Sequence, residues 1–132
     1  ATLVLGRATR EGEVEMCNAG HLEPMLFRQD GGVESLDGAA APIGLFRQQT
    51  FHSTRVQLSP GDTLVLYSDG ISEARNARDE EYGSERLADL FRLCTALTPA
   101  SAVTACIKDL IDFRGNARQA DDQALLVLQR TA

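Results

Sequence analysis

The chain has 132 residues, of which 43% are hydrophobic, 24% charged and 5% aromatic, a length that suits one domain or part of one. Its net charge of -6 argues against nucleic acid or an anionic membrane as the main partner and is compatible with divalent cations. No apolar run approaches the roughly 18 residues of a membrane span, and no secretory signal is recognisable. Three cysteines without CxxC spacing indicate reduced thiols in an intracellular protein.

The first half of the chain predicts β-strands. Polar and apolar residues alternate at 13–18, which indicates a half-buried strand, and Glu11–Gly12 predicts the turn of a hairpin with the run 2–5. Further strands are expected at 24–28, 33–36 and 51–58, with a loop of small residues at 37–50. The continuous apolar run 63–67 predicts a strand covered on both faces, and therefore a central one.

The second half predicts two helices and a last strand. Ser84 is expected to cap the first helix, whose apolar face comprises Leu87, Leu90, Phe91, Cys94 and Leu97. Thr98–Pro99 predicts the start of the second helix and Gly115–Asn116 its end, with an apolar stripe of Val103, Cys106, Ile107, Leu110 and Ile111. The run 124–128 predicts another buried strand. This order indicates an α+β fold with helices on an antiparallel sheet.

Two acidic pairs adjoin the predicted buried strands. Asp69–Gly70 follows the run 63–67, and Asp121–Asp122 precedes the run 124–128. If these strands are antiparallel neighbours, the carboxylates lie at one edge of the sheet, where they repel one another unless a positive charge separates them. Mg²⁺ or Mn²⁺, held by oxygen ligands and water, would do so. Asp–Gly is also an ordinary turn, and paired aspartates can be solvated, so both interpretations stay open.

The other polar features carry less information. Asn18 to His21 predicts a sharp turn with a partly exposed imidazole, and residues 73–81 predict a solvated loop or irregular helix beside Asp69. Neither His21 nor His52 has a cysteine at zinc-ligand spacing. The sequence contains no GxSxG motif and no glycine-rich phosphate loop, so a covalent nucleophile is not indicated.

Four motifs occur in a characteristic order. They are Asn-Ala-Gly-His at 18–21, Leu-Tyr-Ser-Asp-Gly-Ile-Ser-Glu-Ala-Arg-Asn at 66–76, Glu-Glu-Tyr-Gly at 80–83 and Ala-Asp-Asp-Gln-Ala-Leu-Leu-Val-Leu at 120–128. Together they resemble the bacterial SpoIIE-type phosphatases, a branch of the metal-dependent protein phosphatase 2C-like family. The resemblance runs from near residue 1 to the end of the chain.

The resemblance implies an α+β fold in which two antiparallel sheets form a sandwich flanked by helices (αββα), with two Mn²⁺ or Mg²⁺ ions at one edge. It implies hydrolysis of phosphoserine or phosphothreonine on a protein by metal-activated water, the usual substrate being a phosphorylated anti-sigma-factor antagonist. The metal set that it implies is Asp69, Gly70, Asp121 and Asp122, and the loop near the site contains Asn18, Gly20 and His21. Related phosphatases have an aspartate where His21 stands, which argues against a third metal there.

The family's first metal motif, an aspartate followed by glycine in a Gly-His-Gly-rich context, does not occur in this sequence. We therefore expect residues 1–132 to be a single domain fragment, the C-terminal portion of a SpoIIE-type domain. Without the bridging aspartate, three carboxylates face four positive charges, so we expect weak metal binding and little or no phosphatase activity from these residues alone. An uncovered apolar sheet is expected to allow self-association. Gln123–Ala124 replaces the family's usual apolar residue and threonine, which is expected to loosen a hydrogen bond near Asp121.

The sequence thus predicts that the parent protein is a cytoplasmic, metal-dependent serine/threonine phosphatase in signalling, with a phosphorylated regulatory protein as partner, no nucleic-acid partner and no membrane insertion. The alternative is a phosphatase-like module without catalysis that binds a signalling protein through its acidic edge. A third possibility is an unrelated α+β sandwich with solvated acids, in which Asp69 and Asp121 lie far apart.

Overall fold

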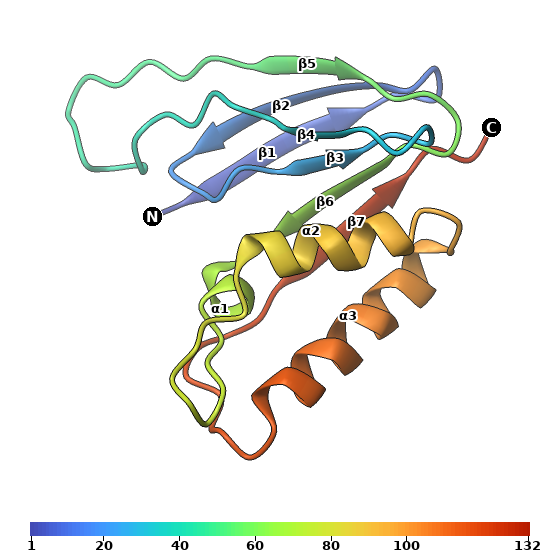
Figure 1. Ribbon diagram of the computed structural model, residues 1–132. Helices are drawn as coiled ribbons and strands as arrows, with labels where there is room; N and C mark the ends of the chain where they lie inside the picture. Colours follow the sequence, from blue (N-terminus) through green and yellow to red (C-terminus); the bar gives the residue numbers. More distant parts are fainter.

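Three strands form the first of two antiparallel sheets in the computed structural model, which describes all 132 residues (Figure 1). Their order is β1-β2-β5, with β1 at Leu3–Ala8, β2 at Glu13–Ala19 and β5 at Thr54–Gln57. The turn between β1 and β2 contains Gly12 with a φ of 89°, a conformation that favours glycine. The predicted hairpin is therefore confirmed.

The second sheet has the order β4-β3-β6-β7 and comprises β3 (Met25–Phe27), β4 (Val33–Ser35), β6 (Thr63–Tyr67) and β7 (Leu125–Gln129). Strand β6 lies between β3 and β7, so the prediction of a central strand is confirmed. Strand β7 is an edge strand, and Leu126 is 55% exposed. The prediction that residues 124–128 form a buried strand was wrong in this respect, because an apolar run alone does not distinguish an edge from a centre.

Three helices follow β6 along the chain: α1 (Asp69–Ser72), α2 (Ser84–Leu93) and α3 (Pro99–Arg114). The cap of α2 is Gly83 rather than Ser84, which is already helical, so that prediction was wrong by one residue. For α3 the prediction is confirmed, because the Thr98 hydroxyl accepts a hydrogen bond from the Ser101 amide at 3.3 Å and the helix ends at Gly115.

The buried face of α3 differs from the predicted stripe. Ala102, Cys106 and Leu110 are buried, whereas Ile107 and Ile111 are about half exposed. Both sets of residues have helical spacing. Contacts of α3 with β7 and α2 determine which set is buried. Leu97 is also exposed, because α2 ends before it at Leu93.

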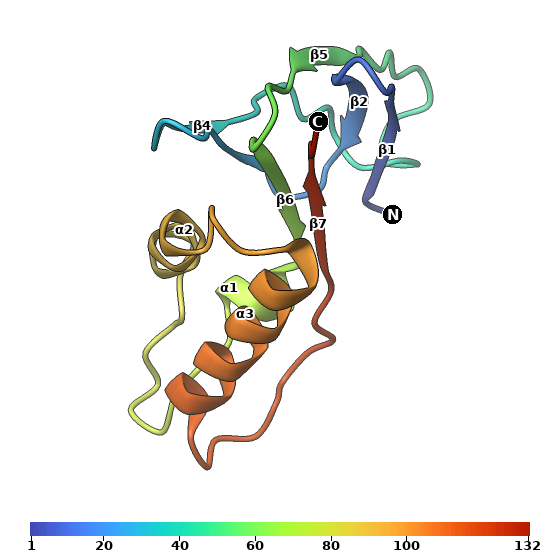
Figure 2. The same ribbon diagram turned by 90° about the vertical axis from the view of Figure 1, so that its right-hand side faces the viewer.

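The molecule has three layers, which Figure 2 shows from the side: helices, the sheet that contains β6 and β7, and the sheet that contains β1. One core lies between the helices and the β6–β7 sheet, and includes Phe27, Val65 and Phe91. A second core lies between the two sheets and is formed by Val14, Met16, Leu26, Leu58 and Leu64. Antiparallel sheets with a helical layer confirm the α+β sandwich, and the helices of this chain cover one of its two sheets.

The space between the sheets is open along β1 and β7. An apolar cavity of about 410 Å³ lies there, with Val4, Leu66 and Leu126 among its lining residues. Both strands are edges of their sheets, so their unpaired backbone groups border this cavity. None of the helices combines the length and hydropathy needed to cross a membrane.

Asp62, just before β6, forms hydrogen bonds with the residues that follow β3. Its carboxylate is 2% exposed and accepts hydrogen bonds from the Arg28 guanidinium at 2.8 Å, the Ser59 amide at 2.8 Å and the Gln29 amide at 3.0 Å. Burial acts to raise the pKa of Asp62, but the three donors outweigh it and hold that pKa below its usual value. This carboxylate therefore helps to fix the strand that leads to Asp69.

Candidate metal site at the β6–β7 edge

Antiparallel pairing of β6 and β7 brings the two acidic segments together. Tyr67, the last residue of β6, pairs with Leu125, the first residue of β7. Two further hydrogen bonds continue this pairing: the Ser68 amide donates to the Ala124 carbonyl at 3.0 Å, and the Ala124 amide donates to the Ser68 hydroxyl at 2.9 Å. Asp69 and Asp121 each lie one to three residues beyond these bonds, so the strand adjacency assumed from the sequence is confirmed.

Gly70 permits an unusually close approach of the two segments. It is buried, and a Cβ added to it would lie 2.9 Å from the carbonyl carbon of Asp122 and closer still to the carbonyl oxygen. The Gln123 side chain also donates to the Gly70 carbonyl at 3.3 Å. Gln123 therefore contributes a hydrogen bond between the acidic segments, and the loosened hydrogen bond near Asp121 that the resemblance implied stays a prediction.

The carboxylates themselves are exposed and only partly engaged. One oxygen of Asp69 accepts the Gly70 amide at 2.9 Å, and one oxygen of Asp121 accepts the Asp122 amide at 2.7 Å. The second oxygen of each has no hydrogen-bond donor within the chain, which leaves it available to a cation. No group of three or more His, Cys, Asp or Glu side chains is arranged to hold a metal ion. The assignment of Asp69, Gly70, Asp121 and Asp122 as a metal set stays a prediction.

A cavity of about 240 Å³ adjoins Asp121 and Gly70. Three arginines that sequence reasoning did not single out line it: Arg75, Arg114 and Arg118. Arg114 donates to the Gln119 side chain at 3.2 Å, and Gln119 in turn donates to the Asp121 carbonyl at 2.9 Å. The signal available in the sequence was the presence of two arginines within seven residues before Asp121. Positive side chains beside an acidic edge are suited to an anion that also contacts a metal.

The predicted loop 73–81 forms part of the same cavity wall. Arg75 and Glu81 pair across it through a backbone bridge and an ion pair, and Arg75 also contacts the Asp79 carboxylate at 3.0 Å. The loop is largely exposed, as expected, and these ion pairs join its two ends.

Asn18 organises the loop that contains Gly20 and His21. Its buried side chain accepts the His21 amide at 2.9 Å and donates to the His21 carbonyl at 3.0 Å. Gly20 has a φ of 74°, and Pro42 packs against the position where a Cβ would lie. His21 lines a cavity of about 340 Å³ together with Ser68 and Ala124. The loop thus borders the turn that leads to Asp69, and its participation in the site stays a prediction.

Curated relatives match most or part of the chain. Protein IcfG of Synechocystis sp. is 26% identical over 120 residues, which cover 90% of this chain and 19% of that protein. Phosphoserine phosphatase RsbP of Bacillus subtilis is 34% identical over 61 residues, which cover 46% of this chain and 15% of that protein. The chain therefore spans less than a fifth of the length of these relatives.

Solved structures share the fold. The RsbU and RsbW domains of Rv1364c from Mycobacterium tuberculosis match 99% of this chain with a TM-score of 0.80 and 29% identity, over 36% of that chain. The SiaA-PP2C domain of Pseudomonas aeruginosa matches 91% with a TM-score of 0.78 and 25% identity, over 47% of that chain. The Mn-presoaked phosphatase domain of SpoIIE from B. subtilis matches 99% with a TM-score of 0.74 over 57% of that chain, and at 17% identity it supports the fold alone.

The family described as Stage II sporulation protein E (SpoIIE) matches residues 1–131. This match covers nearly the whole chain and includes the strands, the acidic edge and the Asn18–His21 loop described above. It excludes the interpretation of an unrelated sandwich with fortuitous acids. The chain belongs to the SpoIIE family, and solved structures that share its fold include phosphatase domains, among them one of the PP2C type.

Proposed function

We propose that this chain forms part of a metal-dependent phosphatase domain that removes phosphate from serine or threonine of a regulatory protein. The main support is the pairing of β6 with β7, which brings Asp69–Gly70 and Asp121–Asp122 to one edge in a member of the SpoIIE family. The relative RsbP is named a phosphoserine phosphatase, which favours phosphoserine as the substrate class. An anti-sigma-factor antagonist in the cytoplasm is the regulatory protein that we propose.

The donor set fits Mn²⁺ or Mg²⁺. Asp69 and Asp121 each offer a free carboxylate oxygen, and hard divalent cations prefer oxygen ligands. Asp122 would add charge nearby, and Gly70 would hold the two segments in register. A bound pair of ions would lower the pKa of a water molecule and polarise the phosphoryl oxygens. These carboxylates alone leave two divalent ions under-neutralised, so we expect weak metal affinity from residues 1–132.

Arg114 and Arg118 would contribute to binding of the phosphate. Both line the cavity beside Asp121, and Arg118 has no ion-pair partner in the chain. A guanidinium there would donate to non-bridging phosphate oxygens and offset their charge as the phosphorus is attacked. Direct attack by water needs no side-chain nucleophile, in agreement with the absence of one from the sequence motifs.

Metal titration of the chain tests the site. We expect isothermal titration with Mn²⁺ to give weak binding that Asp121→Asn or Asp69→Asn reduces at least fivefold, whereas Asp112→Asn, on the exposed side of α3, leaves it unchanged. Unchanged affinity in both site variants would overturn the assignment of these residues. Tight binding at two sites would overturn the expectation that the set is incomplete.

Activity tests separate the phosphatase from a binding module. With the complete gene product and a phosphoserine protein substrate, we expect phosphate release that depends on Mn²⁺ or Mg²⁺ and that is lost in Asp121→Asn. A phosphatase-like module without catalysis would instead keep its affinity for the partner in Asp121→Asn and would bind it equally well in the presence of a chelator.

A further inference from the structure

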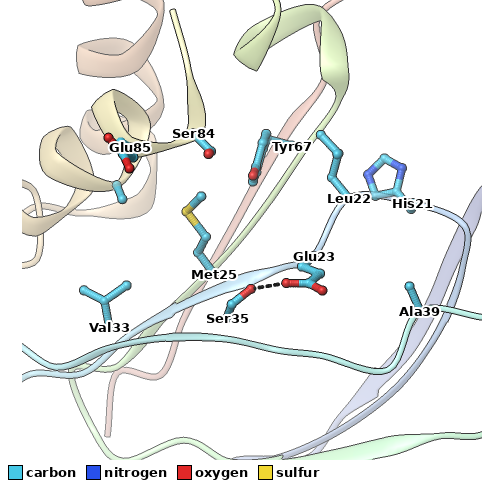
Figure 3. A pocket seen from close by; sticks show the side chains of 11 residues that line it. His21, Leu22, Glu23, Met25, Val33, Ser35, Ala39, Tyr67, Ser84 and Glu85 are labelled. Carbon is cyan, nitrogen blue, oxygen red and sulfur yellow. Dashed lines mark hydrogen bonds between the residues drawn. The ribbon is translucent and has the colours of Figure 1, made fainter.

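An open cleft of about 560 Å³ lies between the start of α2 and the strands β3, β4 and β6 (Figure 3). It is lined by 11 residues, among them His21, Glu23, Met25, Tyr67, Ser84 and Glu85. It shares no lining residue with the arginine-lined cavity beside Asp121. Its volume falls within the range of about 300–1,000 Å³ that is usual for ligand sites.

The charge of the cleft is negative. Glu23 and Glu85 contribute two carboxylates, and no lysine or arginine lines the cleft. Glu23 accepts a hydrogen bond from the Ser35 hydroxyl at 2.6 Å, and Glu85 forms no ion pair. The first turn of α2 adds a partial positive charge of about half a unit, which the two carboxylates exceed. The cleft therefore favours a cation over an anion.

Tyr67 gives a second and independent indication of a ligand. Its side chain is 6% exposed, and its hydroxyl has no hydrogen-bond partner in the chain although it is directed into the cleft (Figure 3). Solvent reaches this hydroxyl through the open cleft, although the ring that carries it is buried. A ligand with a hydrogen-bond donor in the cleft would satisfy this group.

We propose that the cleft binds an arginine side chain of the protein on which the domain acts. The apolar side chains of Met25, Val33 and Ala88 line the cleft and would cover the methylene groups of the arginine. A guanidinium has five donors in a planar fork, enough to bond the Glu23 carboxylate and the neighbouring Tyr67 hydroxyl (Figure 3), which an ammonium group does less well, while Glu85 adds negative charge to the cleft. The identity of this partner rests on the proposed function, whereas binding of the side chain does not depend on metal.

The test uses the 132-residue chain in a buffer with EDTA, so that it is separate from the metal site. The probes are the blocked tripeptides Gly-Arg-Gly and Gly-citrulline-Gly, which have nearly the same shape and differ in charge. Titrations are followed by the backbone amide NMR signals of Glu23, Ser84 and Glu85. We expect the arginine peptide to shift these signals with at least tenfold higher affinity than the citrulline peptide.

Variants then identify the groups responsible. Glu23→Gln and Glu85→Gln are each expected to weaken binding of the arginine peptide about threefold, and together about tenfold, with Tyr67→Phe also weakening it. The matched control is Glu11→Gln, an exposed glutamate in the β1–β2 turn, which should change nothing. Equal binding of the two peptides, or equal effects of the control and cleft variants, would overturn the proposal. Preferential binding of a phosphoserine peptide in the cleft would overturn it too. If the separate titration with Mn²⁺ shows no metal binding while the chain still prefers the arginine peptide, only the proposed function is refuted.

Discussion

Replacing Gly70 with alanine is the most direct test of the contact between the two acidic segments. The new Cβ would lie 2.9 Å from the carbonyl carbon of Asp122 and closer to its oxygen, whereas ordinary contacts begin at 3.4 Å. The segments must therefore separate by about 0.5 Å to relieve the contact with the carbon, and by more to relieve the contact with the oxygen. The neighbour is backbone and not the end of a flexible side chain, so the strain cannot be relieved by a change of rotamer.

The expected cost has two parts. Overpacking of a well-packed position destabilises by about 1–3 kcal/mol. Separation also weakens the hydrogen bonds that the Asp122 carbonyl accepts from Ser68 and that the Gly70 carbonyl accepts from Gln123, each worth about 0.5–1.5 kcal/mol. We expect a total loss of about 3 kcal/mol in the free energy of unfolding, or a decrease in Tm of roughly 10 °C.

Thermal unfolding followed by circular dichroism measures the stability, and hydrogen exchange of the Ala124 amide, which donates to Ser68, reports locally on the contact. Gly6→Ala is the matched control, because neither glycine has a positive φ and a Cβ at Gly6 makes ordinary contacts of 3.5 Å. The control should change the stability by less than about 1 kcal/mol. If Gly70→Ala unfolds like Gly6→Ala and exchange at Ala124 is unchanged, the close approach of the segments is refuted.

Three other predictions follow from the fold. Asp62→Asn removes a buried carboxylate with three donors, and chemical denaturation should show a loss of about 3 kcal/mol. The pKa of Asp62 is lowered in the folded state. The stability that this carboxylate contributes is therefore present above its unfolded pKa of about 4 and is lost as the pH falls through the folded pKa. The wild-type protein should accordingly lose more stability below pH 4 than the variant. Burial raises the pKa of Cys106 to about 11, so iodoacetamide at pH 8 should modify the partly exposed Cys17 and spare Cys106 until the protein unfolds; equal rates in mass spectra would contradict this. The open edge at β7 should promote association, and sedimentation velocity should show that Leu126→Lys reduces it; a wild-type chain that stays monomeric at high concentration would contradict this.

The acidic edge could be predicted from the sequence because two simple patterns agree. Continuous apolar runs at 63–67 and 124–128 mark strands, and an acidic pair at one end of each gives a common edge once the strands are antiparallel neighbours. Only the adjacency had to be assumed. The close approach at Gly70 could not be predicted, because a glycine after aspartate is equally typical of an ordinary turn.

Other features depend on packing that a single sequence does not specify. The predicted face of α3 was wrong because Ile107 and Ile111 have helical spacing just as good as that of Ala102 and Leu110. The positions of β7 and α2 decide which residues are buried. The cleft at α2 was missed for the same reason. Its two carboxylates, Glu23 and Glu85, are 62 residues apart in the sequence and line one cleft only in the folded chain.

Tyr67 and Asp69 are separated by a single residue, so the proposed arginine cleft and the proposed metal site lie on one short stretch of backbone. An extended chain advances about 3.3 Å per residue, and two residues therefore span about 7 Å. A substrate held by its arginine would reach the metals with a phosphorylated residue only a few positions away along its own sequence. The spacing between these two substrate residues would then act as a molecular ruler by which the enzyme chooses among phosphorylation sites.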